Sequence, residues 1–210
     1  MIRLILGTLL CLIFVASHAA ENQATQNQSV ESPALKSGVF EPPRMAPDFS
    51  LASSLGNEFT LSQQRGKVLV LGFGFSYCPN VCPMTLANLA QSFKHLGDLT
   101  KQVQVVYVTV DPERDNPERL REYLAHFNPQ FIGVTGSAEQ LSAVRQAYGI
   151  IAKKEMHKNG TDYEVHHSSY LYLIDQKGLL RALVPFGKSA DDIVHDIKIL
   201  LQDQPQQAAL

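Results

Sequence analysis

The chain has no large excess of charge of either sign, it has few cysteines, and it has no internal repeat. Its 210 residues carry 18 basic side chains against 20 acidic ones, a formal net charge of −2. That balance gives no electrostatic footprint for DNA or RNA, so we expect no nucleic-acid partner. The lack of a repeat argues against a solenoid, and no charge run is long enough to mark a charged tail. With 45% apolar residues, the chain can form one globular domain with its own core.

A long apolar run is also missing. The run from Leu4 to Val15 is short for a membrane-spanning helix, which needs about 20 residues. Arg3 precedes the run, and the small-x-small sequence Ser17-His18-Ala19 follows it. This order is typical of a secretory signal peptide, so we predict one at residues 1–19, with an uncleaved membrane anchor as the alternative.

Only three cysteines are present, and the signal contains one of them. Cys11 is preceded by Leu10, which is bulkier than the small residue found before lipid-attachment cysteines, so we expect Cys11 to be removed with the signal. Export then leaves Cys78 and Cys82, which an oxidising compartment would join unless a reductant or a metal holds them. We expect a periplasmic location or the extracytoplasmic side of the inner membrane, with the protein soluble or membrane-tethered.

Composition also sets the expected domain boundaries. Residues 20–43 are rich in Gln, Asn, Ser, Glu and Pro and show no periodicity, which is typical of a disordered tether. Residues 44–203 carry the periodic patterns of a folded domain, and we expect a monomer. Residues 204–210 are polar and should form a disordered tail.

The periodic patterns predict an α/β domain. Two apolar runs, 67–75 and 103–110, are typical of strands buried inside a parallel sheet, and the helical pattern between them predicts a βαβ crossover. Caps at Asn116, Ser137 and Ser189 predict three more helices. Further strands are expected at 47–51, 57–61, 131–135, 150–156, 162–165, 169–174 and 179–184. The result is a central mixed β-sheet flanked by helices, similar to the thioredoxin fold, with an added N-terminal β-hairpin.

The sequence Cys78-Pro79-Asn80-Val81-Cys82-Pro83 lies where the first long strand passes into a helix. We expect Cys78 at the N-cap, Pro79 at the first helical position and Cys82 in the first turn. Four residues apart on a helix is one face, so the sulfurs could share a metal ion or close a disulfide. The helix dipole also favours thiolate over thiol. The pair has one residue more between its cysteines than the C-x-x-C redox signature.

A metal site needs further ligands, and His166-His167 are the best candidates. They directly precede a strand that should lie inside the sheet, on a loop that would face the dithiol in a thioredoxin-like fold. Thioredoxin-like oxidoreductases usually place a cis-proline there, but Ser168 and Ser169 follow in this chain. An imidazole can ligate copper or zinc. We therefore expect one of these two histidines to be a ligand.

Three motifs together resemble the Sco/SenC family: the Cys78–Pro83 sequence, the loop Val110–Asp115, and the segments 163–168 and 172–175. The resemblance implies a thioredoxin-fold copper chaperone that acts in the assembly of cytochrome c oxidase. It implies copper ligands at Cys78, Cys82 and His167. It also implies two partners, the copper-site subunit of the oxidase and a thiol reductant protein.

The chain departs from the family pattern at one position, because His166 stands where the family usually has Asp. The resemblance also places Asp111 near the site, and a turn-capping carboxylate is as good an interpretation of that residue as a direct role. His167 is the preferred ligand of the pair, and His166 could substitute when His167 is lost.

Two thiolates and one imidazole favour Cu(I) and also accommodate Cu(II), whereas structural zinc prefers four protein ligands. Copper delivery to the oxidase is thus the preferred function. The alternative is an enzyme, a thiol–disulfide oxidoreductase that uses Cys78 and Cys82 to reduce the cysteines of the oxidase copper site. A redox or copper sensor also stays open. A peroxiredoxin is disfavoured because Phe75 occupies the position of its threonine.

Overall fold

The computed structural model describes residues 34–158, 160 and 162–203. The predicted signal at 1–19 and the predicted tail at 204–210 lie outside these residues, as does most of the predicted tether. Within the described part of the chain, no helix is both long and apolar enough to cross a membrane.

Two buried parallel strands form the centre of the sheet. β4 (Val68–Gly74) and β5 (Val103–Thr109) pair in parallel along their whole lengths, and α1 (Val81–Leu96) connects them. All of β4 is buried, which explains its continuous apolar sequence. β6 (Ile132–Thr135) extends the parallel part on one side, and the antiparallel strands β9 (Leu171–Ile174) and β10 (Leu179–Val184) extend the sheet on the other.

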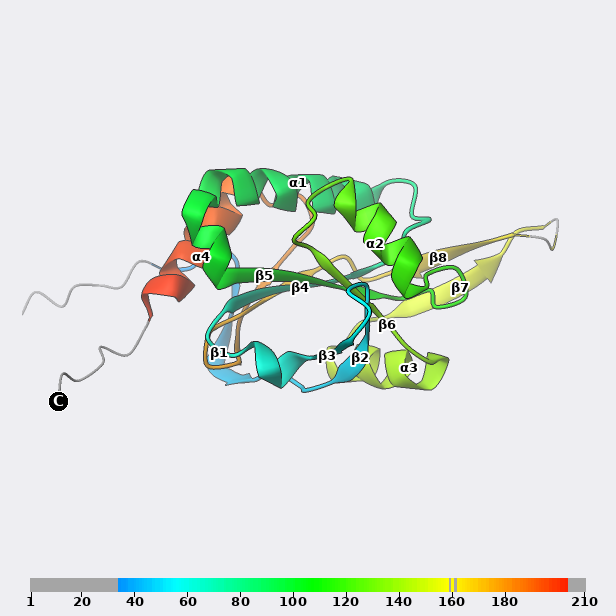
Figure 1. Cartoon of the computed structure of the whole chain (residues 1–210), viewed down its shortest axis with the longest axis horizontal. Helices are drawn as coiled ribbons and strands as arrows, with labels where there is room; N and C mark the ends of the chain where they lie inside the picture. The colour runs from blue at the N-terminus through cyan, green and yellow to red at the C-terminus, as the bar shows by residue number, and fades with distance from the viewer. Residues whose placement is uncertain (1–33, 159, 161, 204–210) are drawn as a thin grey trace, which may run out of the picture. The chain divides into compact units, whose positions relative to one another are not determined.

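The helices cover both faces of this mixed sheet (Figure 1). α1 packs against α4 (Ala190–Gln202), and α2 (Pro117–Ala125) lies on the same side over β6. α3 (Ala138–Ala147) lies on the opposite side. The predicted caps are confirmed, because Asn116, Ser137 and Ser189 each accept a hydrogen bond from a backbone N–H in the first turn of their helix. Two short 3-10 helices, Leu61–Gln64 and Gly97–Gln102, complete the helical elements of the described residues.

The predicted N-terminal hairpin is present at one edge of the sheet. β2 (Ser50–Ser53) and β3 (Glu58–Thr60) pair with each other, and β2 also joins β6. The full order of the eight strands is β1-β10-β9-β4-β5-β6-β2-β3. The arrangement of this sheet and its helices confirms the predicted α/β, thioredoxin-like class.

The opposite edge differs from the expectation. β1 (Gly38–Met45) pairs with β10, so this strand begins inside the segment for which a tether was predicted. Its side chains are almost all exposed, which leaves no alternating apolar pattern to find. Pro42 and Pro43 also argue against a strand, yet an edge strand tolerates them because half of its N–H groups need no partner.

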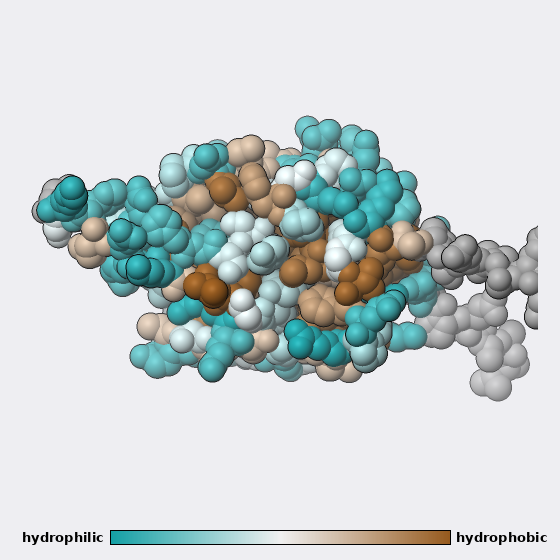
Figure 2. Space-filling model, turned by 180° about the vertical axis from the view of Figure 1, so that it is seen from behind, coloured by the Kyte–Doolittle hydropathy of each residue, from teal (hydrophilic) through white to brown (hydrophobic). Residues whose placement is uncertain are grey.

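A separate two-stranded hairpin lies beside the sheet. β7 (Ala152–Met156) and β8 (Tyr163–His167) pair only with each other, and the hairpin reaches well beyond the end of the sheet in Figure 1. Figure 2 shows that the projecting part is mainly hydrophilic, whereas apolar residues gather over the middle of the face shown. The base of this hairpin carries His167.

Candidate metal centre

The turn after β4 places the first cysteine. The helix α1 begins at Val81 with Asn80 as its N-cap, so the expectation that Cys78 is the N-cap and Pro79 the first helical residue is wrong. The reason is local: Asn80 has φ −139° and ψ −76°, outside the helical region, so the helix cannot extend back to Pro79. Cys82 does lie in the first turn, and its backbone N–H donates to Cys78 Sγ at 3.5 Å.

The two cysteines differ in access to solvent. Cys82 is 3% exposed and belongs to the apolar core, whereas Cys78 is half-buried and lines a cleft. Neither cysteine is in a disulfide. Burial of only one sulfur means that a reagent or a partner arriving through the cleft meets Cys78 first.

The last residue of β8 brings an imidazole to the cysteines. His167 Nε2 lies 3.3 Å from Cys82 Sγ, and Nδ1 lies 2.9 Å from the carbonyl oxygen of Ser168. A carbonyl can only accept, so Nδ1 carries a proton, and Nε2 is the ring nitrogen directed at the sulfur. The ring packs edge-on against Phe75, with centroids 5.8 Å apart, which helps to fix its orientation. His167 therefore lies in a strand and not in the loop expected from sequence.

The ligand atoms of Cys78, Cys82 and His167 all lie within 4.8 Å of one another. Among the described residues, they form the one group of three or more such side chains close enough to hold a metal ion. Two atoms bound to one ion at about 2.0–2.3 Å lie at most about 4.6 Å apart, so little movement would be needed to close the site. The three predicted ligands are thus brought together, and their binding of a metal stays a prediction.

The cysteine pair shares its proton unequally. The hydrogen bond from the Cys82 thiol, together with those from His167 and two backbone amides, lowers the pKa of Cys78 to about 3 against the cost of partial burial. The pKa of Cys82 is raised, first because its thiol donates to Cys78 and then because it is buried. The reduced protein therefore carries a thiolate at Cys78 beside a thiol at Cys82.

Asp111 has a structural role in this arrangement. Its carboxylate is 4% exposed and accepts hydrogen bonds from Tyr163 Oη at 2.8 Å and from Arg114 Nε at 2.5 Å. Arg114 also lies over the ring of Tyr163, 3.9 Å from its centroid, and 5.0 Å from that of Tyr77. Asp111 is absent from the metal-ligand group. It instead ties the loop after β5 to the strand that carries His167.

His166 is directed away from the sulfurs. Its Nε2 lies 3.5 Å from a Glu155 oxygen and 3.9 Å from a Glu164 oxygen, and its side chain is 60% exposed. Successive residues of a strand point to opposite faces, so His166 and His167 cannot both face the cysteines while β8 keeps its register. Of the two histidines, the geometry places only His167 in the group.

Two residues near the site carry roles that the sequence did not reveal. Arg114 was part of a recognised loop motif, but nothing in the motif shows that its side chain would stack on the ring of Tyr163 in β8. Tyr107 on β5 was counted only as one apolar position of a buried strand. Its hydroxyl is nevertheless close to Cys82 Sγ, since a Cβ built on Gly74 would overlap that hydroxyl and lie 2.8 Å from the sulfur.

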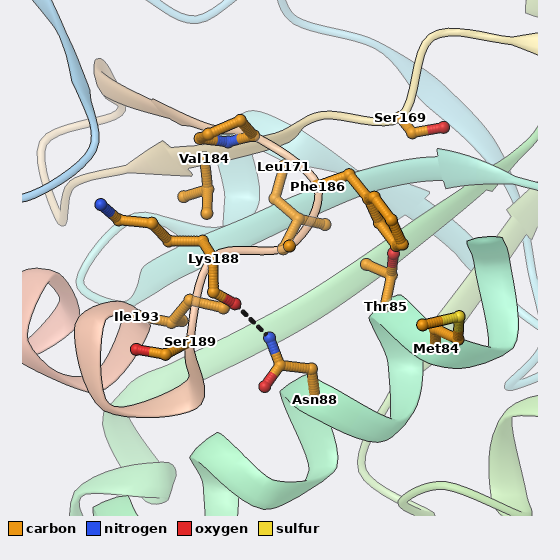
Figure 3. A pocket seen from close by; sticks show the side chains of 12 residues that line it. Met84, Thr85, Asn88, Ser169, Leu171, Val184, Phe186, Lys188, Ser189 and Ile193 are labelled. Carbon is orange, nitrogen blue, oxygen red and sulfur yellow. Dashed lines mark hydrogen bonds between the residues drawn. The ribbon is translucent and has the colours of Figure 1, made fainter.

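Cys78 and His167 face a cleft of about 300 Å³ that Tyr77, Arg114 and Tyr163 also line. A second cavity of about 270 Å³ adjoins it, with Ser169 lining both. Figure 3 shows this second cavity between α1 and the loop that leads into α4. There Asn88 Nδ2 donates to the Lys188 carbonyl oxygen at 2.6 Å and joins the two elements.

Comparison with known proteins gives consistent results. The family model described as SCO1/SenC matches residues 39–202. A SCO2-like protein of Rickettsia felis is 35% identical over 132 residues, which cover 62% of this chain and 64% of that protein. The chain therefore spans less than two thirds of the length of this relative.

Solved structures agree with this match. The copper-bound structure of ScoI from Bradyrhizobium japonicum is 29% identical, with a TM-score of 0.68, and the match covers 73% of this chain and 98% of that one. The copper-bound structure of yeast Sco1 is 30% identical, with a TM-score of 0.69, and the match covers 79% and 92%.

Proposed function

Because the chain belongs to the SCO1/SenC family, we propose that it is a copper-binding metallochaperone that delivers copper to the copper centre of cytochrome c oxidase. The observation that carries this proposal is the cluster of Cys78, Cys82 and His167 ligand atoms within 4.8 Å. The similar proteins of Bradyrhizobium japonicum and yeast were each determined with copper bound. Cytochrome c oxidase is proposed as the acceptor because the three sequence motifs resemble those of the family.

Two thiolates and one imidazole suit both oxidation states of copper. Thiolates are soft ligands that select Cu(I), and imidazole also suits Cu(II). His167 meets a further requirement, because its Nδ1–H is held by Ser168 and the opposite nitrogen is left to bind. Three ligands leave a position open for a ligand of the acceptor protein.

The exposure of the sulfurs suggests the order of exchange. Cys78 lines the cleft and Cys82 is buried beneath it. An acceptor ligand that enters through the cleft would replace Cys78 first, while Cys82 and His167 still hold the ion. Copper passes as Cu(I) or Cu(II) without a change of oxidation state, so this step needs no electron donor.

Copper binding is tested by anaerobic titration of the reduced protein with Cu(I) and Cu(II). We expect one tightly bound copper, with a thiolate-to-copper absorption band for Cu(II). Cys78→Ala and Cys82→Ala should each abolish tight binding, because one thiolate and one imidazole are too few ligands. Tight binding of one copper by either variant would contradict the ligand assignment.

The two neighbouring histidines provide a matched comparison. His167→Ala should weaken Cu(II) binding more than Cu(I) binding, because two thiolates alone can hold Cu(I). His166→Ala should leave both affinities unchanged, since this side chain faces Glu155 and Glu164. Equal effects of the two substitutions would argue against His167 as the third ligand.

A second candidate function is supported by the half-buried thiolate at Cys78, whose pKa is lowered to about 3. Such a sulfur could attack a disulfide in the oxidase copper site and form a mixed disulfide with one of its cysteines. Cys82, as a thiolate, would then attack the Cys78 sulfur of that mixed disulfide, which closes the Cys78–Cys82 disulfide and releases the acceptor cysteine in its reduced form. The two electrons would come from the Cys78–Cys82 dithiol, which a thiol reductant protein must regenerate. The same reductant is needed before copper loading, because a disulfide offers no thiolates.

Transfer distinguishes the two functions. The copper-loaded protein is mixed without oxygen with the copper-free soluble domain of the oxidase copper-site subunit, first with its cysteines reduced and then with them oxidised. Appearance of copper in the reduced acceptor supports delivery. Reduction of the oxidised acceptor by the copper-free protein, with no copper transfer in the first case, would support the oxidoreductase instead.

A further inference from the structure

Tyr107 carries a buried hydroxyl group that lacks a partner. The residue lies on β5 and is 3% exposed, and within the described part of the chain its hydroxyl has no hydrogen-bond partner. A buried polar group left unpaired destabilises a fold, whereas phenylalanine would fill the same place without that cost. An unpaired group of this kind calls for an explanation outside the packing of the core.

The hydroxyl lies next to the sulfur of Cys82. Gly74 makes this possible, because a side chain there would overlap the Tyr107 oxygen and lie 2.8 Å from Cys82 Sγ. Cys82, Tyr107 and His167 also line a common cavity of about 10 Å³. That volume is at the lower limit for one water molecule, so a water bridge is a poor explanation of the unpaired hydroxyl.

The sulfur of Cys82 needs hydrogen-bond donors once it is a thiolate. It is almost fully buried, and a buried anion without donors is unstable. Once a metal is bound, His167 offers no N–H to the sulfur, because Nε2 would be a metal ligand and Nδ1–H is bound to Ser168. The backbone N–H of Cys82 itself donates to Cys78. The remaining groups beside the sulfur are the Phe75 backbone amide and the Tyr107 hydroxyl, both of which favour the thiolate.

Tyr107 is suited to donate in this place. Burial and the nearby sulfur of Cys82 raise the pKa of its hydroxyl well above the ordinary value, so the group keeps its proton. Its ring is held in the apolar core between β4 and α1 by the position of β5. The structure shows no hydrogen bond between this hydroxyl and the sulfur, so the two side chains must move relative to each other for the bond to form when a metal binds.

We propose that Tyr107 is a positioning residue that donates a hydrogen bond to Cys82 Sγ when a metal ion is bound, and so favours Cu(I) over Cu(II). The copper part of this inference rests on the proposed function. A thiolate gives less of its charge to Cu(I) than to Cu(II), so its sulfur is more negative in the Cu(I) state and accepts the stronger hydrogen bond. Hydrogen bonds to a ligand sulfur are an established means of tuning a copper site.

The test compares Tyr107→Phe with Tyr148→Phe in the whole protein. Tyr148 is a matched control, because it is also buried but its hydroxyl donates to the Pro47 carbonyl oxygen at 2.8 Å, away from the sulfurs. Tyr107→Phe should lower the ratio of Cu(I) to Cu(II) affinity by up to about tenfold, because the ratio reports the difference between the two hydrogen bonds, which is smaller than one whole hydrogen bond to a charged group. It should also move the thiolate-to-Cu(II) band to longer wavelength. Tyr148→Phe should change neither quantity.

The stability of the metal-free protein is a second readout, because removal of a hydroxyl with a purely structural role would lower it. Since the Tyr107 hydroxyl is unpaired in the metal-free protein, Tyr107→Phe should leave Tm within about 2 °C of the wild type or raise it, and Tyr148→Phe should lower it. A variant Tyr107→Phe that unfolds, or loses as much stability as the control, would overturn the inference. So would an unchanged affinity ratio and band position.

A third titration, with Co(II), separates the two proposals. Co(II) also binds thiolate and imidazole and does not change oxidation state under these conditions, so its thiolate-to-metal band reports the hydrogen bond without copper redox chemistry. If the wild type binds copper and Tyr107→Phe has the same affinities and band positions as the wild type for both metals, the role of Tyr107 is overturned and the proposed function is not. A wild type that binds neither metal overturns the proposed function and the role of Tyr107 with it.

Discussion

Cys78 is the most reactive single residue that this site presents. Its pKa is lowered to about 3, so it is a thiolate at every pH above that value, and it faces the cleft. We predict that iodoacetamide modifies Cys78 at a nearly constant rate between pH 5 and pH 8. An ordinary cysteine, with a pKa of about 8.5, slows about tenfold for each pH unit over most of that range. Cys82 should stay unmodified because its pKa is raised and it is buried. Mass spectrometry of the reduced protein measures both rates.

The cause of this low pKa can be tested separately. The hydrogen bond from Cys82 is its largest contribution, so Cys82→Ala should raise the pKa of Cys78 and make its alkylation slow as the pH falls. Cys82→Ser keeps a donor in the same place and should stay closer to the wild type. Equal pH profiles for the two variants would contradict the assigned cause.

Single residues also show how far sequence alone leads. Cys78, Cys82 and His167 were all predicted, because their residue types and spacing carry chemistry of their own. The N-cap position of Cys78 was not, since the turn at Asn80 depends on backbone dihedrals that no residue type in it dictates. Tyr107 was missed for a different reason: its neighbour Cys82 is distant in the chain, and only the packing of β5 under α1 brings them together.

Among the elements, the β7–β8 hairpin decides whether His167 reaches the cysteines. It is held to the rest of the site by Arg114, which bonds the Asp111 carboxylate and donates to the Tyr163 carbonyl oxygen at 3.3 Å. We predict that Arg114→Ala destabilises the protein by about 2 to 3 kcal/mol, because it leaves the buried Asp111 carboxylate without its cation. It should also speed amide hydrogen exchange in β8 and weaken Cu(II) binding.

Lys154→Ala is the matched control for this element. Lys154 pairs with Glu113 at 2.6 Å and also lies over the Tyr163 ring, but its side chain is exposed to solvent. Removal of an exposed ion pair costs less than about 1 kcal/mol, so β8 should keep its protection. Equal exchange rates in the two variants would show that Arg114 does not anchor the hairpin.

The elements differ in how far sequence predicts them. β4 and β5 could be predicted because burial on both faces requires a continuous apolar sequence, and the capped helices because their caps are local. β1 could not, since its exposed edge position requires no apolar pattern and is set by its partner β10. The tether predicted up to residue 43 therefore overlapped a strand.

For the domain as a whole, a contact between the two ends of its sequence holds the edge strand β1 in place. Asp196 on α4 is fully buried, and its carboxylate accepts hydrogen bonds from the backbone N–H groups of Lys36 at 2.7 Å and Ser37 at 3.0 Å. These bonds hold the chain immediately before β1, which pairs with β10. The segment from residue 36 to 45 is thus part of the domain because α4 binds it.

We predict that Asp196→Ala releases this segment, because the two N–H groups lose their acceptor and β1 loses the anchor at its start. Unfolding by urea should show a loss of about 3 to 6 kcal/mol, the sum expected for two hydrogen bonds to a charged group. Trypsin at low concentration should then cleave after Lys36 and Arg44 in the variant before it cleaves the wild type there. Asp191→Ala is the control, since Asp191 is exposed and pairs only with His95 among the described residues. If Asp196→Ala and the wild type are cleaved at these two positions at the same rate, then pairing with β10 alone holds β1, and the boundary of the domain does not depend on α4.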